Sequence, residues 1–202
     1  MNQGEHPSVP RITRDSLMTL EAYARERNAF RARVLAHKRD RTVHLGDHVT
    51  LLFEDELTIR YQIQEMLRIE KTFEEAGIQD ELDAYNPLVP DGTNLKATML
   101  IEYEDVDERR AALAQLKGIE EAVWLRVEGY PSVRAVADED LERENEDKTA
   151  AVHFVRFELT PSMIAAFKAG SEVALGIDHP HYRTEILALP EPVRAALRAD
   201  FA

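Results

Sequence analysis

Side chains that could bind a metal are concentrated near residue 180. Asp178, His179 and His181 fall within four residues, and His153 lies on an earlier predicted strand that could approach them. Residues two apart on a strand share a face, and imidazole and carboxylate groups bind divalent metals. These four residues are therefore a candidate site for a divalent metal. Pro180 leaves an alternative open, because a turn at this proline would splay the two imidazoles outward.

A second candidate site combines polar side chains from two predicted helices. Arg27 and Arg31 fall within the apolar arc of the first helix. Gln62 and Glu70 fall within the apolar face of the next helix, whose other members are Ile59, Ile63, Met66, Ile69 and Phe73. Packing the two faces together would bury an arginine–carboxylate cluster, which predicts a polar pocket for an anion or a reacting group. A structural ion pair, or arginines at the edge of the interface, is the alternative.

A third group, His44 and His48, lies on either side of Gly46. Residues four apart in an extended strand are about 13 Å apart, so these histidines could share a metal only if Gly46 turns the chain back. A solvent-exposed strand end is the simpler interpretation.

Several kinds of chemistry are excluded by composition. The 202 residues include no cysteine, so disulfides, thiolate nucleophiles and cysteine-bound metal centres are excluded. The sequence also has no G-x-x-x-x-G-K, G-x-G-x-x-G, G-x-S-x-G or H-E-x-x-H motif. Nucleotide-loop, serine-hydrolase and zincin mechanisms therefore have no support from motifs.

Charge is distributed unevenly along the chain. Lys and Arg total 25 against 38 Asp and Glu, a net charge of -13, yet residues 1–41 hold nine cations and five anions. The overall negative charge argues against binding to nucleic acid or an anionic membrane. The basic first helix could bind an acidic partner or simply pack against the acidic remainder of the chain.

Periodicity predicts an α+β fold in two parts. Residues 1–90 form a helical part, with helices from Asp15 to about His37 and from Asp55 to Ala76 and a small hairpin between them. Residues 91–202 alternate with a period of two and form a mainly antiparallel sheet with a C-terminal helix. We expect the two parts to act as one functional unit. No apolar stretch approaches the roughly 18 residues of a membrane helix, and residues 1–10 lack the apolar run of a signal peptide, so we expect a soluble cytoplasmic protein.

The second part contains two strand-helix-strand-strand units. Their glycines, prolines and arginines align, with Gly118, Pro131 and Arg134 in the first unit matching Gly170, Pro180 and Arg183 in the second. This order over residues 95–188 resembles the duplicated arrangement of the gyrase-inhibitor-like and SOUL haem-binding folds. The resemblance rests on element order and does not identify a ligand.

Two signatures resemble a known bacterial family. Residues 44–54 (HLGDHVTLLFE) with 58–70 (TIRYQIQEMLRIE), and residues 176–182 (GIDHPHY), are similar to domain-of-unknown-function family three-five-zero-one. The resemblance covers nearly the whole chain, and this family has no established activity to carry over. Its genes often lie beside those of rubrerythrin and iron–sulfur oxidoreductases, which implies a role in redox or peroxide stress and a protein partner from that pathway.

Three functions follow as hypotheses. The first is a non-enzymatic accessory or ligand-binding protein of redox stress, with a pocket at Arg27, Arg31, Gln62 and Glu70. The second is a metal-dependent enzyme that uses the histidine and aspartate site, together with Glu70, as metal ligands or acid–base groups. The third is a subunit that binds an acidic partner through its basic first helix.

Overall fold

The computed structural model describes residues 12–137 and 148–202, so the opening residues 1–10 lie outside it. Within this part of the chain, seven α-helices and two four-stranded antiparallel sheets confirm the α+β class. The first elements are η1 (Arg14–Ser16), α1 (Leu20–Arg39), β1 (Thr42–Leu45), β2 (Val49–Phe53), α2 (Glu56–Glu70), α3 (Glu75–Tyr85) and η2 (Asn86–Leu88). The later elements are β3 (Asn94–Ile101), α4 (Val106–Gln115), α5 (Ile119–Ala122), β4 (Val123–Val127), β5 (Val133–Arg134), β6 (Val152–Glu158), α6 (Pro161–Lys168), β7 (Val173–His179), β8 (Tyr182–Ile186) and α7 (Glu191–Arg198).

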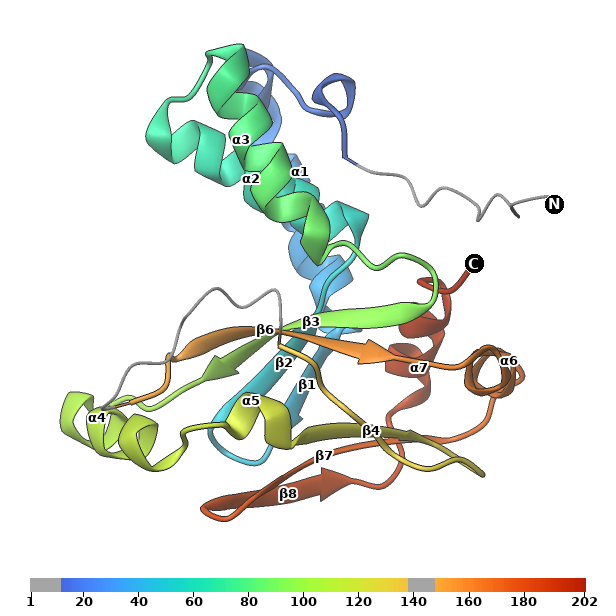
Figure 1. Ribbon diagram of the computed structural model, residues 1–202. Helices are drawn as coiled ribbons and strands as arrows, with labels where there is room; N and C mark the ends of the chain where they lie inside the picture. The colour runs from blue at the N-terminus through green and yellow to red at the C-terminus, as the bar shows by residue number, and fades with distance from the viewer. Residues whose placement is uncertain (1–11, 138–147) are drawn as a thin grey trace, which may run out of the picture.

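Both sheets take strands from the two repeated units (Figure 1). One sheet has the order β1-β2-β3-β6 and the other β5-β4-β7-β8, and all neighbouring strands are antiparallel. The units β3-α4-β4-β5 and β6-α6-β7-β8 have the predicted order. Each unit gives its first strand to one sheet and its last two to the other. The predicted hairpin is β1–β2, and because β2 pairs with β3, the sheet continues across position 90.

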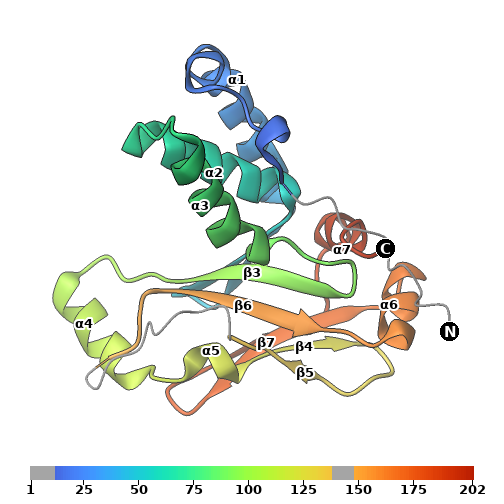
Figure 2. The ribbon, with the colours of Figure 1, turned by 45° about the horizontal axis from the view of Figure 1, so that its top comes forward.

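A hydrophobic core fills the space between the two facing sheets (Figures 1 and 2). Alternation along each strand turns every second side chain inward. The inward residues include Leu95, Ala97, Met99 and Ile101 of β3, Val155 and Phe157 of β6, Val123, Leu125 and Val127 of β4, and Val173, Leu175 and Ile177 of β7. At one edge the sheets are linked by a backbone bridge between Val136 and Arg156. At the other edge the Tyr182 hydroxyl of β8 donates to the Leu45 carbonyl at 2.7 Å.

Helices α1, α2 and α3, which we call the helical part from here on, project from the sheet that contains β3 (Figure 1). Helix α2 packs between α1 and α3. Its buried residues Ile59, Ile63 and Leu67 recur every four positions and meet Ile78 and Leu82 of α3. No helix in the described ranges is long and apolar enough to cross a membrane.

The predicted start of the first long helix and the predicted end of the second are wrong, whereas the predicted start of the second at Asp55 is confirmed. Helix α1 begins after Thr19, whose hydroxyl accepts from the Ala22 amide, and Asp15 instead lies in η1. Helix α2 ends at Glu70, because Lys71 adopts the left-handed conformation with φ 56°. Gly77, predicted to end this helix, lies inside α3.

Candidate functional site

A pocket of about 760 Å³ opens where the helical part, the loop before β3 and α7 meet. Its lining comes from four segments, and we call it the α7 pocket. The lining residues are His37, Asp40, Arg41, Asp55, Glu56, Leu57, Val89, Pro90, Gly92, Pro192, Ala195, Ala196, Ala199, Asp200, Phe201 and Ala202. This volume lies within the range of about 300–1,000 Å³ typical of small-molecule sites.

The amphipathic pattern of α7 positions one wall of the pocket. Val193 and Leu197 are one helical turn apart and buried, so the small exposed side chains of Ala195 and Ala199 line the pocket. Phe201 continues the buried face and contacts the Phe167 ring edge-on, at 5.4 Å between centroids. The sequence of α7 therefore gives the pocket a smooth apolar wall.

The floor of the pocket depends on a close approach at Gly92. This glycine has φ +92°, and an added Cβ would lie 2.9 Å from the Ala202 Cβ. The Ala202 amide donates to the Gly92 carbonyl at 3.2 Å. A larger residue at position 92 would push residue 202 away and reshape the floor.

A buried arginine holds the polar end of the pocket together. The Arg41 side chain is 3% exposed. Its Nη2 and Nη1 donate to Asp200 Oδ1 and Oδ2 at 2.6 and 2.9 Å. Nη2 also donates to the Ala196 carbonyl at 3.1 Å, and Nε lies 3.0 Å from Asp55 Oδ2. Arg41 therefore ties the end of α7 to the helical part.

Asp55 serves both a helix and the pocket. Its Oδ1 accepts from the Thr58 amide at 2.9 Å, which caps α2, while the Thr58 hydroxyl accepts from the Asp55 amide. Its other oxygen, Oδ2, faces the pocket and lies 2.5 Å from His37 Nε2. The cap thus fixes the carboxylate that faces His37 and Arg41.

The two aspartates respond differently to burial. Burial raises the pKa of Asp200, and the hydrogen bonds and charge of Arg41 oppose that rise only in part. Burial also acts to raise the pKa of Asp55, but the charge of Arg41, the Thr58 amide and His37 outweigh it and lower that pKa below its ordinary value. Asp55 is therefore ionised at neutral pH.

The pocket has an excess of negative charge. Among the described residues, its lining contains the four carboxylates of Asp40, Asp55, Glu56 and Asp200 but a single guanidinium, that of Arg41. Arg41 is already engaged by two of these carboxylates, and Glu56 pairs with Arg60 outside the lining at 3.2 Å. An acidic rim beside alanine and proline walls suits a cation that carries an apolar group.

An arginine–carboxylate cluster forms between α1 and α2, but with a carboxylate that was not predicted. Arg27 Nε and Nη2 donate to Glu65 Oε1 and Oε2 at 2.7 and 2.8 Å, and Tyr23 and Arg68 also donate to this carboxylate. The pKa of Glu65 is lowered to about 2, and the hydrogen bond from Arg27 is the largest cause. Burial, followed by the bond to Glu65, raises the pKa of Tyr23. Four donors satisfy Glu65, as in a structural ion pair.

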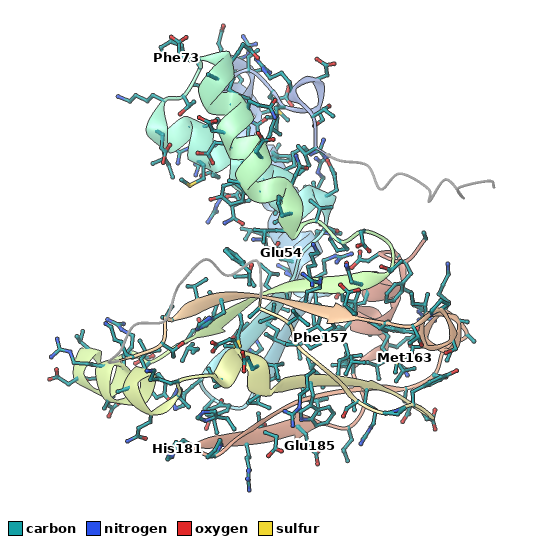
Figure 3. All side chains as sticks on the ribbon, viewed as in Figure 1. Glu54, Phe73, Phe157, Met163, His181 and Glu185 are labelled. Carbon is teal, nitrogen blue, oxygen red and sulfur yellow. The ribbon has the colours of Figure 1, made fainter. Side chains whose placement is uncertain are left out.

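The other members of the predicted cluster lie elsewhere. Arg31 and Glu70 are exposed and Gln62 is half-buried, so the prediction that Glu70 lies within a buried face is wrong. That face included Ile69 and Phe73, which are 60% and 70% exposed. Figure 3 shows Phe73 at the end of the helical part farthest from the sheets. The buried polar residues of α2 are Thr58, which takes part in its N-terminal cap, and Gln64, whose Oε1 accepts from the Met18 amide at 2.6 Å.

The four candidate metal ligands are not brought together. The Asp178 carboxylate pairs with Arg183 at 3.1 Å, on the outer face of its sheet. His179 Nε2 donates to the Lys117 carbonyl at 3.0 Å, and its Nδ1 accepts from the His181 amide. His181 is exposed in the β7–β8 turn (Figure 3).

His153 has a separate environment. It is 1% exposed, and its Nε2 lies 2.9 Å from the Thr149 hydroxyl. Across residues 12–137 and 148–202, no three His, Asp or Glu side chains are grouped closely enough to hold a metal.

His44 and His48 have different partners, although Gly46 does turn the chain, with φ +70°. His44 Nδ1 lies 3.0 Å from the Thr50 hydroxyl. His48 Nδ1 lies 3.0 Å from the Glu102 carbonyl, and its ring stacks on Tyr103. The hairpin therefore does not aim the two imidazoles at a common point.

Comparison with known proteins establishes the family. The model of a family described as "Protein of unknown function (DUF3501)" matches residues 11–201. The chain belongs to this family. A crystal structure of a protein of unknown function from Burkholderia pseudomallei K96243 is 58% identical. That alignment covers 96% of this chain and 100% of the other, with a TM-score of 0.91. The curated proteins contain no match.

The α7 pocket of this DUF3501 chain was not predicted from the sequence. Arg41 and Asp200 are 159 residues apart, and no spacing pattern relates them. For Asp55, the sequence predicts the start of a helix and gives no indication of a pocket. The sequence does contain one local signal for the buried arginine. Arg41 lies directly before a strand, and an arginine that is buried at such a position needs acidic partners.

Proposed function

We propose that the protein binds a small organic cation with an apolar body in the α7 pocket. The observation that carries the proposal is a pocket of about 760 Å³ whose lining has four carboxylates against one guanidinium. Asp40, an exposed carboxylate of the lining, would attract the cationic group. Ala195 and Ala199 would contact the apolar body, since small side chains leave space for a ligand.

The fixed geometry of the polar end also supports binding. Arg41, Asp55 and Asp200 hold one another through hydrogen bonds, so few side chains have to be ordered when a ligand enters. Preorganisation of this kind reduces the entropic cost of binding. The arrangement fits the ligand-binding hypothesis drawn from the sequence, but at a different location.

Paired fragments test the proposal. Phenethylamine and 3-phenylpropionate share one hydrocarbon skeleton and carry opposite charges. In ¹⁵N NMR titrations of the full chain, the amine is expected to shift the amide signals of Gly92, Ala196 and Ala202, with a dissociation constant near the millimolar range, about -4 kcal/mol. The carboxylate is expected to leave these signals in place.

Two variants with matched controls locate the site. Ala195→Phe fills the apolar side and should abolish the shifts, whereas Ala114→Phe, at an exposed position of α4, should not. Asp40→Lys should weaken amine binding, whereas Asp80→Lys, at an exposed position of α3, should not. Equal binding of both fragments, or amine binding that survives Ala195→Phe, would overturn the proposal.

The link to redox stress, and to a protein partner from that pathway, rests on the family resemblance alone. The cytoplasmic location also stays a prediction, and it rests on the hydropathy of the sequence. For the metal-dependent enzyme, the separate partners of His153, Asp178 and His179 give no support.

A further inference from the structure

Helix α1 has an exposed apolar patch on the side opposite its buried residues. At 100° per residue, Ala29, Ala32, Leu35 and Ala36 point away from the face that packs on α2. All four are exposed, and Leu35 is 45% exposed. Figure 2 shows α1 on the outer side of the helical part, with α2 between it and α3. We call this patch and its surroundings the α1 outer face.

Four arginines surround the patch. Arg25 and Arg39 lie at its two ends, and Arg31 and Arg33 lie on its two sides. The side chains of Arg31 and Arg39 form no hydrogen bond or ion pair with any described residue, and the Arg33 guanidinium lies over the Phe30 ring at 4.9 Å. Arg25 makes one exposed contact with Glu21 at 3.3 Å. The four arginines outnumber Glu21 and Asp40, the two exposed carboxylates at the ends of the patch, so the rim has an excess of positive charge in a chain with net charge -13.

We infer that the α1 outer face binds an acidic amphipathic α-helix of a partner protein. Glutamates or aspartates on both sides of that helix would meet the four arginines. Its apolar stripe would cover Leu35 and the alanines, whose small side chains allow two helix axes to approach to about 8–10 Å. Complementary charge of this kind directs the choice of partner and speeds association.

A second copy of this chain fits the same face poorly. Antiparallel pairing centred on Ala32 would place Arg25 opposite Arg39 and Arg31 opposite Arg33. Parallel pairing would place each arginine opposite itself. Either arrangement brings like charges together, which is unfavourable.

Nucleic acid also fits less well. A phosphate backbone would meet the arginines but would leave the apolar centre around Leu35 without a partner. The net charge of -13 would in addition repel a polyanion from the protein as a whole. The apolar centre therefore favours a helix over a phosphate backbone.

A designed peptide tests the inference with the full chain. The probe is a fluorescein-labelled 21-residue peptide with leucine and alanine along one helical face and glutamate elsewhere. Fluorescence anisotropy is expected to show binding that weakens as salt is raised from 50 to 500 mM. A peptide of the same composition in scrambled order should bind at least about tenfold more weakly, because it has no apolar stripe.

Matched variants separate the contributions of charge and apolar contact. Arg31→Glu with Arg39→Glu should weaken peptide binding about tenfold or more, whereas Arg110→Glu, at an exposed position of α4, should not. Leu35→Ser should also weaken binding, whereas Val106→Ser, at a site 56% exposed, should not. Ala195→Phe should leave peptide binding unchanged, so this inference and the ligand pocket are tested independently.

Three outcomes would overturn the inference. The first is no binding of the amphipathic peptide at 1 mM protein. The second is equal binding of the scrambled peptide. The third is tighter binding of a 20-base-pair DNA duplex that Arg31→Glu abolishes, which would assign the arginines to nucleic acid instead.

Discussion

Arg41 donates to both carboxylate oxygens of Asp200, a residue 159 positions later in the chain, at 2.9 and 2.6 Å. Both side chains are almost completely buried, with 3% and 5% exposed. This pair holds the last residues of the chain against the junction of α1 and β1. The same contact therefore fixes the polar end of the α7 pocket and the position of the C-terminal residues.

Replacing Arg41 with methionine is expected to destabilise the protein strongly. The variant leaves Asp200 buried without its cation, and breaking a buried pair in this way costs about 3–5 kcal/mol. Urea unfolding measures the loss. Arg39→Met, at an exposed position of the same helix, should change the free energy of unfolding by less than about 0.5 kcal/mol.

A double variant separates the pair from its surroundings. Arg41→Met with Asp200→Leu removes both charges, so it should be more stable than Arg41→Met alone. If the double variant is less stable than the single one, the cost does not come from the unpaired Asp200 carboxylate.

Most of the sheet region could be predicted from the sequence because its signals are local. Alternation from Leu95 to Tyr103 marks β3, and the side chains that were expected to share a face do point into the core. The helix ends were predicted less well. Lys71 ends α2 in a left-handed conformation that residues other than glycine seldom adopt, so the sequence carried no stop signal there.

The Tyr182 hydroxyl joins the two sheets at the β1–β2 turn. It donates to the Leu45 carbonyl at 2.7 Å and accepts from the His48 amide at 3.1 Å. Tyr182→Phe should lower the free energy of unfolding by about 1–2 kcal/mol, since two backbone groups lose their partner. Hydrogen exchange of the His48 amide should become faster.

Tyr130→Phe is the control for Tyr182→Phe. The Tyr130 hydroxyl forms no hydrogen bond with any described residue, so its removal should have little effect on stability. Unchanged exchange of the His48 amide in Tyr182→Phe would mean that the tyrosine does not hold the hairpin.

Gly176 makes room for the tryptophan of the outer sheet face. An added Cβ would lie 2.5 Å from Trp124 Cζ2 and 2.8 Å from the Thr184 carbonyl. Gly176→Ala should therefore displace the indole and destabilise the protein by about 1–3 kcal/mol. The chain has a single tryptophan, so its fluorescence reports the displacement directly.

A double-mutant cycle checks the cause of this effect. With Trp124→Ala already present, Gly176→Ala should cost clearly less than it does alone, because one of its two clashes is gone. Additive effects of the two changes would place the strain at the Thr184 carbonyl instead.

The candidate site was harder to predict than the fold. Periodicity correctly placed Arg27 at the interface of α1 and α2, where a carboxylate meets it. The exposed apolar residues Ile69 and Phe73 shift the face that periodicity predicts for α2 toward Glu70, whereas the carboxylate that contacts Arg27 is Glu65. The α7 pocket combines segments from both ends of the chain, and local spacing carries no information on such contacts.

Glu54 is expected to make the stability of the protein depend on pH. It lies between the helical part and the sheets (Figure 3) and is 2% exposed. Its Oε1 accepts from the Thr98 hydroxyl at 2.6 Å, whereas Oε2 has no hydrogen-bond partner among the described residues. Burial raises the pKa of Glu54 above its ordinary value of 4.5, and the nearby Thr58 and Thr98 hydroxyls and the charge of Lys38 oppose that rise only in part.

The sign of the effect follows from the raised pKa. The folded chain keeps this proton at pH values where the unfolded chain has lost it, so the contribution of Glu54 to stability is complete below about pH 4.5 and is lost as pH rises through the folded pKa. Glu54→Gln keeps the acceptor for Thr98 but cannot ionise. Relative to wild type, it should gain stability between pH 4 and pH 8 in urea unfolding. For Glu128→Gln, at an exposed position, the free energy of unfolding should follow that of wild type with pH. A Glu54→Gln advantage that shrinks as pH rises would show that folding lowers the pKa of Glu54 instead of raising it.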